Sequence, residues 1–220
     1  MNYPLITQTS SFDVAILALG DYPMHTIPVG VLQNVHHIIC CDNAIENLDP
    51  TLYNKVEAVV GDIDSISEAF KAKFKDCLHI EHEQEDNDMT KATRYCIAQN
   101  YKYIVYLGAT GLREDHTLGN ISLLIEYLQR YHIQPTMLTN YGTFVPCYGD
   151  TTFQSFSRQQ VSIFNISCNH LENKGLRWQS YPYKAWWQGT LNEALGNEFS
   201  FTADGYYLVY TTHEPKQKHL

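Results

Sequence analysis

The sequence lacks long hydrophobic runs and has few positive charges. No apolar stretch approaches the roughly 20 residues that a membrane-spanning helix needs, and the N-terminus lacks the basic start and apolar stretch of an export signal. The chain carries 15 lysines and arginines against 24 aspartates and glutamates, a net charge of −9. So few cations cannot form the broad basic surface of a nucleic-acid-binding protein. We therefore expect a cytoplasmic protein that binds neither a membrane nor nucleic acid.

Several well-known sequence patterns are also absent. The 6 cysteines include no C-x-x-C pair, which excludes a zinc ribbon, and we expect them to be reduced thiols. Neither the phosphate-binding pattern G-x-x-x-x-G-K-[ST] nor the dinucleotide pattern G-x-G-x-x-G occurs. A G-x-S-x-G nucleophile elbow is missing as well. Hydrophobic residues nevertheless make up 44% of the 220 residues, which is enough to form a core and excludes disorder as the main state.

The first two thirds of the chain alternate short β-rich runs with segments of helical periodicity. Residues His116–Tyr131 and Met89–Asn100 have the apolar spacing of amphipathic helices. Ser65 and Glu68 form a capping box that predicts a third helix towards Phe74. This alternation predicts an α/β domain with a mostly parallel sheet. The predicted strands are Val14–Leu19, Ile38–Cys41, Ala58–Val60, Leu78–Ile80, Tyr103–Leu107 and Thr136–Thr139.

The character of the chain changes near Asn140. From there it is rich in threonine, serine and aromatic residues and has no long helical pattern, which predicts a small antiparallel β domain. Asp204 and Gly205 predict a hairpin turn between the last two strands. We expect Trp178 in the core of this domain or in a subunit interface. The predicted strands are Val161–Ile166, Phe199–Ala203 and Tyr206–Thr211.

Glycine or acidic residues follow five successive predicted strands. Ligands of an open parallel sheet bind outside the carboxyl ends of its strands, so these residues mark a candidate site. In extended chain Asp62 and Asp64 would point to the same face, and two carboxylates held together need a cation between them. Their hard oxygen atoms suit Mg²⁺. Asp88 and Asp115 each precede a helix and could be ordinary caps, but together with the first pair they favour a shared metal site.

The segment Gly108–Gly111 lies between a predicted strand and a predicted helix. Glycines at such a turn let backbone N–H groups approach phosphate oxygens, and the start of a helix favours an anion. Arg113 could add a charged fork to a phosphate. We therefore expect this turn to bind an anionic group.

Taken in order, these segments resemble the successive motifs of the thiamine pyrophosphokinase family. The resemblance spans roughly residues 14–210. Two later segments, Lys174–Trp178 and Leu195–Glu198, resemble the C-terminal motifs of the same family. The chain departs from the family pattern at Asn43, Asn87 and Gly196, where glycine, threonine and serine are usual. The motifs that carry the resemblance are Cys41–Ala44, Gly61–Ser65, Glu83–Lys91 and Gly108–His116.

The resemblance implies a transferase that moves the diphosphate of ATP to the hydroxyl of thiamine and releases AMP, with Mg²⁺ as cofactor. It implies an α/β domain over residues 1–140 that binds ATP and Mg²⁺, a β-sandwich over residues 141–220 that binds thiamine, and a homodimer with the active site near the subunit interface. The implied metal ligands are Asp62, Asp64 and Asp88, which with Asp115 are also the implied catalytic residues. The implied ATP-binding residues are Asp42, Gln84, Thr110, Gly111 and Arg113, and the implied thiamine-binding residues are Asn197, Trp187 and Phe199.

Two other functions stay open on the residues themselves. An apolar strand followed by Asp62-Ile63-Asp64 is typical of Mg²⁺-dependent phosphatases with an aspartyl nucleophile, although no second acidic pair of the expected kind follows. The aromatic C-terminal region could also belong to a non-catalytic ligand-binding module.

Overall fold

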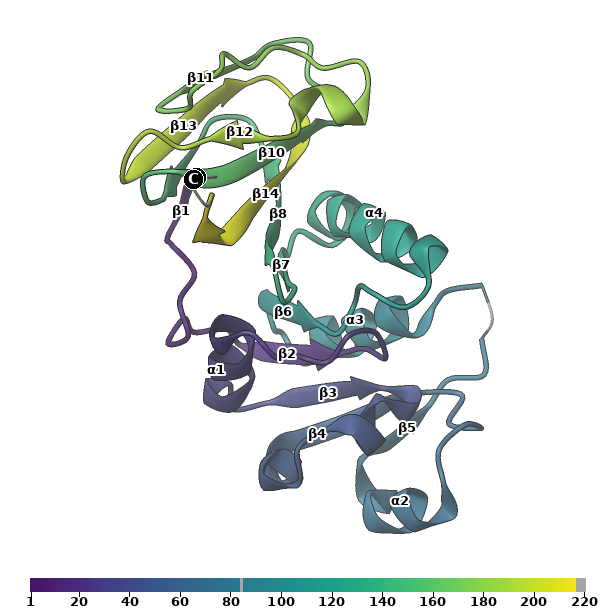
Figure 1. Cartoon of the computed structure of the whole chain (residues 1–220). Coiled ribbons are helices and arrows are strands. Elements are labelled where there is room, and N and C mark those ends of the chain that lie inside the picture. Colours follow the sequence, from purple (N-terminus) through teal and green to yellow (C-terminus); the bar gives the residue numbers. More distant parts are fainter. Residues whose placement is uncertain (84, 217–220) are drawn as a thin grey trace. The chain divides into compact units, whose positions relative to one another are not determined.

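The computed structural model describes residues 1–83 and 85–216 and divides into two compact units. Figure 1 labels the elements of both units. One unit is Thr7–Asn140, and the other joins Met1–Ile6 to the chain from Tyr141 onwards. The expected α/β domain included the first six residues, whereas strand β1 (Asn2–Tyr3) pairs in parallel with β9 (Thr151–Gln154) of the second unit.

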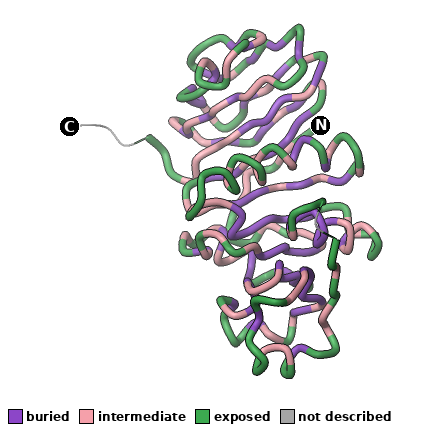
Figure 2. Tube along the Cα trace, turned by 90° about the vertical axis from the view of Figure 1, so that its right-hand side faces the viewer, coloured by how far each residue is buried: buried purple, intermediate pink, exposed green. Residues whose placement is uncertain are grey.

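The first unit contains a parallel sheet of six strands in the order β7-β6-β2-β3-β4-β5. The predicted fold class is confirmed. The inner strands are buried along most of their length (Figure 2), because their uninterrupted apolar runs face packed elements on both sides. The strands are β2 Val14–Leu17, β3 Ile38–Cys41, β4 Val56–Gly61, β5 Leu78–Ile80, β6 Tyr103–Leu107 and β7 Gln134–Leu138.

In the described part of this unit, four α-helices and three 3₁₀-helices connect the strands. The predicted helices at Met89–Asn100 and His116–Tyr131 are present with slightly shifted ends. The first helix was not predicted, because Pro28 and Gly30 interrupt its sequence pattern. The α-helices are α1 Thr26–Asn34, α2 Glu68–Lys73, α3 Asp88–Ala98 and α4 Glu114–Tyr131, and the 3₁₀-helices are η1 Asp42–Asn47, η2 Pro50–Lys55 and η3 Lys75–Cys77.

The capping box predicted for the third helix is wrong. Helix α2 begins at Glu68, and the Ser65 hydroxyl instead donates a hydrogen bond of 2.5 Å to the carboxylate of Asp42, which lies far away in the sequence. The backbone N–H of Ser67, the residue before the helix, donates to the Glu46 side chain at 2.7 Å. A long-range polar partner thus replaced the local cap that the sequence pattern favoured.

The second unit consists of two sheets that share a core. One sheet has the order β1-β9-β13-β11 and the other the order β12-β10-β14-β8, and all pairs except β1 with β9 are antiparallel. Aromatic rings of both sheets meet between them, among them Phe153, Phe201 and Tyr207. This arrangement confirms the expected β-sandwich. The bounds not yet given are β8 Gly142–Tyr148, β10 Gln159–Asn165, β11 Leu171–Lys174, η4 Trp186–Gly189, β12 Asn192–Glu193, β13 Glu198–Ala203 and β14 Tyr206–Pro215.

The hairpin predicted at Asp204-Gly205 is wrong, because strands β13 and β14 belong to different sheets. The turn is a corner between the sheets. The carboxylate of Asp204 accepts hydrogen bonds from the backbone N–H groups of Asn169 (2.8 Å) and His170 (2.9 Å). A Cβ on Gly205 would lie 2.7 Å from the backbone of Ser167, so only glycine fits this close approach.

The cysteines and Trp178 were each expected in a particular state or environment. All six cysteines are unpaired, as expected for reduced thiols, and five of them are buried. Trp178 does not lie in the core, since half of its surface is exposed and its ring lies 5.2 Å from the Arg177 guanidinium, and its place in a subunit interface stays a prediction. Among residues 1–83 and 85–216, no helix has the length and apolar character needed to cross a membrane.

Removal of the Tyr3 ring tests the assignment of the N-terminal residues to the second unit. The ring stacks on Phe153 with 4.6 Å between centroids, and its hydroxyl donates to the Pro146 carbonyl at 3.3 Å. We expect Tyr3→Ala to lower the free energy of unfolding of this unit by about 2 kcal/mol, less than for a fully buried ring. Tyr3→Phe, the control, should lower it by at most about 1 kcal/mol.

Urea unfolding followed by tryptophan fluorescence measures this unit alone, because all 3 tryptophans (Trp178, Trp186 and Trp187) lie in it. Equal stability of Tyr3→Ala and the unmodified protein would contradict the assignment.

Candidate active site

A pocket of about 460 Å³ lies at the carboxyl ends of the parallel strands in the first unit. The turns after β2, β3, β4 and β6 line it, together with the first turns of α3 and α4. This is the edge at which glycine and acidic residues were predicted to gather. Four aspartates line the pocket, namely Asp42, Asp62, Asp86 and Asp88.

Asp88, the first residue of α3, is partly buried and lies near other carboxylates of the pocket. Partial burial raises the pKa of its carboxyl group above the ordinary value, the nearby ammonium group of Lys91 lowers it, and the charges of Asp42 and Asp62 raise it further. The carboxylates are therefore close enough to repel each other. A bound cation would relieve this repulsion.

Asp42 provides the clearest test of whether a hard cation fits the pocket. Its backbone follows β3 in a left-handed conformation (φ 43°), and the missing Cβ of Gly61 makes room for it, since a Cβ there would lie 3.0 Å from the Asp42 side chain. One carboxylate oxygen accepts from Ser65, while the other, Oδ1, is buried without a hydrogen-bond partner among the described residues. A buried carboxylate oxygen without a partner is unfavourable, and a metal ion is one way to satisfy it.

Asp64 does not line the pocket with its sequence neighbour Asp62. Its side chain is exposed, and its backbone N–H donates to the Asp62 carboxylate at 3.3 Å. The extended geometry assumed from the sequence is wrong, because Ile63 between them has left-handed backbone angles (φ 56°). No group of three histidine, cysteine, aspartate or glutamate side chains within the described part of the chain is already close enough to hold a metal ion. A site made of Asp62, Asp64 and Asp88 would need side-chain movement and stays a prediction.

The glycine turn after β6 is joined to the turn after β2 by backbone hydrogen bonds. The N–H of Gly20 donates to the Gly108 carbonyl (2.6 Å), and the N–H of Asp21 donates to the Thr110 carbonyl (2.8 Å). Gly111 has φ 80° and lines the pocket, whereas the side chain of Thr110 does not. A Cβ on Gly111 would lie 2.2 Å from the carboxyl carbon of Asp21. The turn therefore depends on glycine for its backbone angle and for its packing.

Arg113 and Asp115 form a bidentate ion pair at the start of α4. The guanidinium donates to the two carboxylate oxygens at 3.1 and 2.5 Å. This interaction with Arg113 lowers the pKa of Asp115 to about 2. Arg113 lines the pocket, whereas the exposed Asp115 does not. Asp115 thus contacts the pocket only through Arg113, and its catalytic role stays a prediction.

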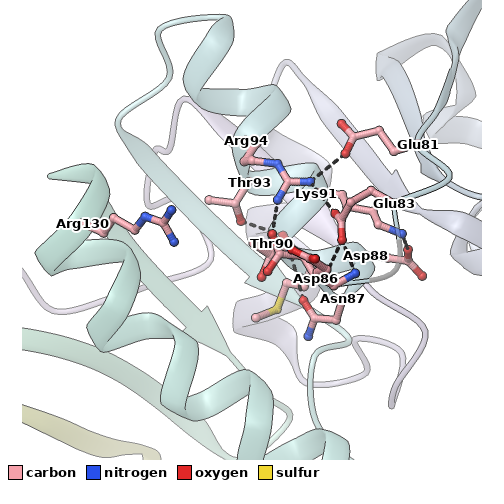
Figure 3. Close-up of polar contacts among 12 residues, drawn as sticks. Glu81, Glu83, Asp86, Asn87, Asp88, Thr90, Lys91, Thr93, Arg94 and Arg130 are labelled. Carbon is pink, nitrogen blue, oxygen red and sulfur yellow. Dashed lines mark hydrogen bonds and ion pairs between the residues drawn. The ribbon is translucent and has the colours of Figure 1, made fainter.

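Five further polar residues line the pocket that the sequence analysis did not select, namely Asp86, Asn87, Lys91, His116 and Asn120. Lys91 is 3% exposed, and its Nζ lies 3.3 Å from the Asp88 carboxylate one turn earlier on α3. Asn87 caps α3 by accepting from the Thr90 N–H (2.9 Å), and its amide donates to the Asn120 side chain (3.0 Å). Figure 3 shows Asn87, Asp88 and Lys91 together at the start of this helix. Lys91 could have been found from its i,i+3 spacing to Asp88 on the buried face of the helix.

Asn120 of α4 connects the two walls of the pocket. Its carbonyl oxygen accepts from the Asn87 amide, and its own amide donates to the backbone carbonyl of Ala109 at 2.8 Å. This chain of amides fixes the start of α3 relative to the glycine turn. Its residues lie 33 and 11 positions apart, so sequence spacing gives no indication of it.

The residues expected to contact thiamine lie in the second unit, in different environments. Trp187 is 74% exposed, and Asn197 is exposed with its carbonyl accepting from the Ser155 N–H at 2.8 Å. Phe199 is 1% exposed and stacks on Phe153 with 5.0 Å between ring centroids, so its ring belongs to the core rather than to a ligand surface. Gln84, expected to bind ATP, lies outside the described residues.

Two family models match the chain. Residues 30–135 match the model described as "Thiamin pyrophosphokinase, catalytic domain", and residues 142–210 match the model described as "Thiamin pyrophosphokinase, substrate-binding domain". The first range contains most of the pocket, and the second contains most of the sandwich. The curated protein "Thiamin pyrophosphokinase 1" of Caenorhabditis elegans is 30% identical over 76 residues, which are 32% of this chain and 31% of that protein. The matched part is thus about a third of that relative.

Solved thiamin pyrophosphokinase structures have the same fold. The structure from Bacillus subtilis superimposes with a TM-score of 0.76 at 18% identity and covers 90% of this chain and 98% of that chain. The structure from Candida albicans gives a TM-score of 0.77 at 14% identity, with 97% and 93% covered. The yeast structure gives 0.75 at 15% identity, with 96% and 90% covered.

Two glycine substitutions test the geometry of the turn that lines the pocket. Gly111→Ala introduces a Cβ at a left-handed position against Asp21, and we expect it to destabilise the first unit by about 2 kcal/mol. Gly119→Ala, the control, lies on the open face of α4 with nothing within 4 Å of the new Cβ. It should stabilise the helix by about 0.5–1 kcal/mol. Thermal unfolding followed by circular dichroism measures both, and equal melting temperatures of the two variants would contradict the turn geometry.

Proposed function

The chain belongs to the thiamin pyrophosphokinase family, and we propose that it transfers the diphosphate group of ATP to the hydroxyl of thiamine, with release of AMP. The observation that carries the proposal is the pocket in which four aspartates face a glycine turn and Arg113 at the carboxyl edge of the sheet. Carboxylates that need a cation and backbone groups that can approach phosphate are what a nucleotide–metal complex requires. The two family models supply the division into a catalytic and a substrate-binding domain.

We assign roles to the pocket residues on this basis. A bound Mg²⁺ would neutralise the diphosphate and align it for attack by the alcohol. Asp62, Asp64 and Asp88 are the proposed ligands, and the unsatisfied Oδ1 of Asp42 fits the same hard-oxygen chemistry. Asp42, Gln84, Thr110, Gly111 and Arg113 are the proposed ATP-binding residues, with Arg113 held in place by Asp115.

Among the described residues, Lys91 and Arg113 are the two non-histidine cations that line the pocket. Each is already paired with a carboxylate, so neither places an isolated charge against an approaching substrate. The buried Lys91 limits the repulsion on Asp88 before a cation arrives. Arg113, which is exposed, is free to exchange part of its pairing with Asp115 for a phosphate oxygen.

We further propose that thiamine contacts the second unit through Asn197 and Trp187 and that the chain works as a homodimer. The support is the exposure of large aromatic side chains there, including Trp178, Trp186 and Trp187 at 50%, 50% and 74%. Exposed aromatic residues are typical of interfaces and of sites that stack on ring ligands. The six unpaired cysteines support the proposed cytoplasmic location.

Product analysis tests the proposed reaction directly. The protein is incubated with ATP, Mg²⁺ and thiamine, and the nucleotides and thiamine esters are separated by chromatography. We expect AMP and thiamine diphosphate in equal amounts, and no product when EDTA removes the metal. ADP with thiamine monophosphate would mean a simple kinase, inorganic phosphate without thiamine ester would mean a phosphatase, and absence of turnover would favour a binding module. Each of these three outcomes would contradict the proposal.

Asp88→Asn tests the role of the pocket carboxylates. We expect kcat/KM to fall at least about 100-fold, the scale of removing one preorganised electrostatic group. Asp76→Asn, the control, removes an exposed aspartate of η3 that does not line the pocket and should retain wild-type turnover. Near-normal turnover of Asp88→Asn would refute its role.

Asp64→Asn separates a metal ligand from a surface residue. The exposed carboxylate of Asp64 joins the site only if binding of the cation draws it in. We expect the variant to lose at least about 100-fold in turnover, as for Asp88→Asn. Asp62→Asn is measured alongside it. If the turnover of Asp64→Asn falls less than about twofold while that of Asp62→Asn falls strongly, Asp64 is not a metal ligand and only Asp62 and Asp88 remain as proposed ligands.

A further inference from the structure

Arg94 of α3 binds three carboxylates of the segment that precedes this helix. Its guanidinium donates to Glu81 at 2.8 Å, to Glu83 at 3.1 Å and to Asp86 in a third, short contact. Figure 3 shows these side chains converging on the guanidinium from one side. Arg94 itself does not line the pocket, whereas Asp86 does. The arginine therefore reaches the site only through its partners.

The segment held by Arg94 is strongly acidic. Five of the eight residues 81–88 are aspartate or glutamate, and between β5 and α3 the described residues of the segment form no helix or strand. Such a segment repels itself and the neighbouring Asp42 and Asp62. The guanidinium of Arg94 opposes this repulsion, because its planar arrangement of N–H groups can donate to several carboxylates at once.

The ion pairs also determine the backbone of the segment. Glu83 accepts hydrogen bonds from the N–H groups of Glu85 and Asp86, the second at 2.8 Å, while its other oxygen accepts from Arg94. These contacts lower the pKa of Glu83, first through the Asp86 N–H and then through Arg94. The turn that leads to Asn87 and Asp88 is thus closed on a side chain that Arg94 holds in place.

We propose that Arg94 is a positioning residue that holds Glu81, Glu83 and Asp86 against α3 so that the pocket is ready to receive the metal–nucleotide complex. The identity of the bound nucleotide rests on the proposed function. The statement that Arg94 holds the acidic segment in place does not depend on that function. Without Arg94, a fraction of the molecules would have the segment away from the pocket. Only the conformation with the segment in place would be competent to bind the nucleotide. The apparent affinity then falls by the fraction of molecules in the competent state, while the bound complex turns over normally.

Arg94→Gln is the decisive variant, and Arg94→Lys keeps the charge without the fork. If the competent fraction drops to one tenth, the KM for Mg-ATP rises about tenfold in Arg94→Gln, with kcat within about twofold of wild type. Arg94→Lys should show about a threefold rise, because an ammonium group cannot donate to three carboxylates in the same geometry. Arg130→Gln is the matched control, since Arg130 is an exposed arginine of α4 with Glu126 as its ion-pair partner at 3.3 Å.

Amide hydrogen exchange of residues 81–88, measured on the whole chain without nucleotide, tests the structural part separately. We expect faster exchange in Arg94→Gln than in wild type and in Arg130→Gln. Thermal unfolding of all three should be similar, because ion pairs that remain accessible to solvent contribute little to stability. If Arg94→Gln fails to fold, the exchange of Arg94→Lys is compared with that of wild type and Arg130→Gln instead.

The outcomes are distinguishable. Unchanged exchange, an unchanged KM, or a loss confined to kcat each overturns the positioning role. A wild-type protein that releases no AMP overturns the proposed function, and the exchange comparison then still decides whether Arg94 holds the segment.

Discussion

Mutual repulsion of carboxylates at one edge of a parallel sheet is the constraint on which the site depends. Four aspartates line the pocket against one lysine and one arginine, and both cations are already paired with a carboxylate. The pocket thus stays negative, although the proposed substrate is itself a polyanion. A divalent cation would resolve this conflict, because it would be attracted to the aspartates and would in turn attract the phosphates of the proposed substrate. Burial is the main cause of the raised pKa of Asp88, and the charges of Asp42 and Asp62 add a smaller contribution in the same direction.

The backbone around the pocket carries strain that the sheet beneath it supports. Asp42, Ile63 and Leu112 have φ angles of 43°, 56° and 59°, and they lie in the turns after β3, β4 and β6. Left-handed angles are unfavourable for residues other than glycine, most of all for a β-branched residue such as Ile63. Each turn leaves a buried strand whose register is fixed by its neighbours. The rigid strands therefore allow the turns to hold conformations that place carboxylates rather than conformations of lowest local energy.

Much of the fold could be predicted because its information is local. The buried strands of the first unit are contiguous apolar runs, and Ile38–Cys41 and Tyr103–Leu107 agree with prediction to the residue. Predictions from the sequence were wrong where pairing between distant segments determines the structure. Two residues of β1 belong to a sheet whose other strands begin about 150 positions later, so a single boundary at Asn140 does not separate complete domains. Likewise the Asp204-Gly205 turn has the sequence of a hairpin, but packing places its strands in different sheets.

The site follows the same division between local and long-range information. That acidic residues and glycines end successive strands is visible in the sequence, and parallel pairing brings those ends together into one pocket. Whether Asp64 points to the pocket depends on the backbone angle of Ile63, which no side-chain pattern encodes. The partners of Arg94 lie 8 to 13 positions away across an irregular segment. Helical spacing rules do not reach that far, so the residue that gathers the acidic segment has no sequence pattern of its own and becomes visible only when β5 and α3 are placed side by side.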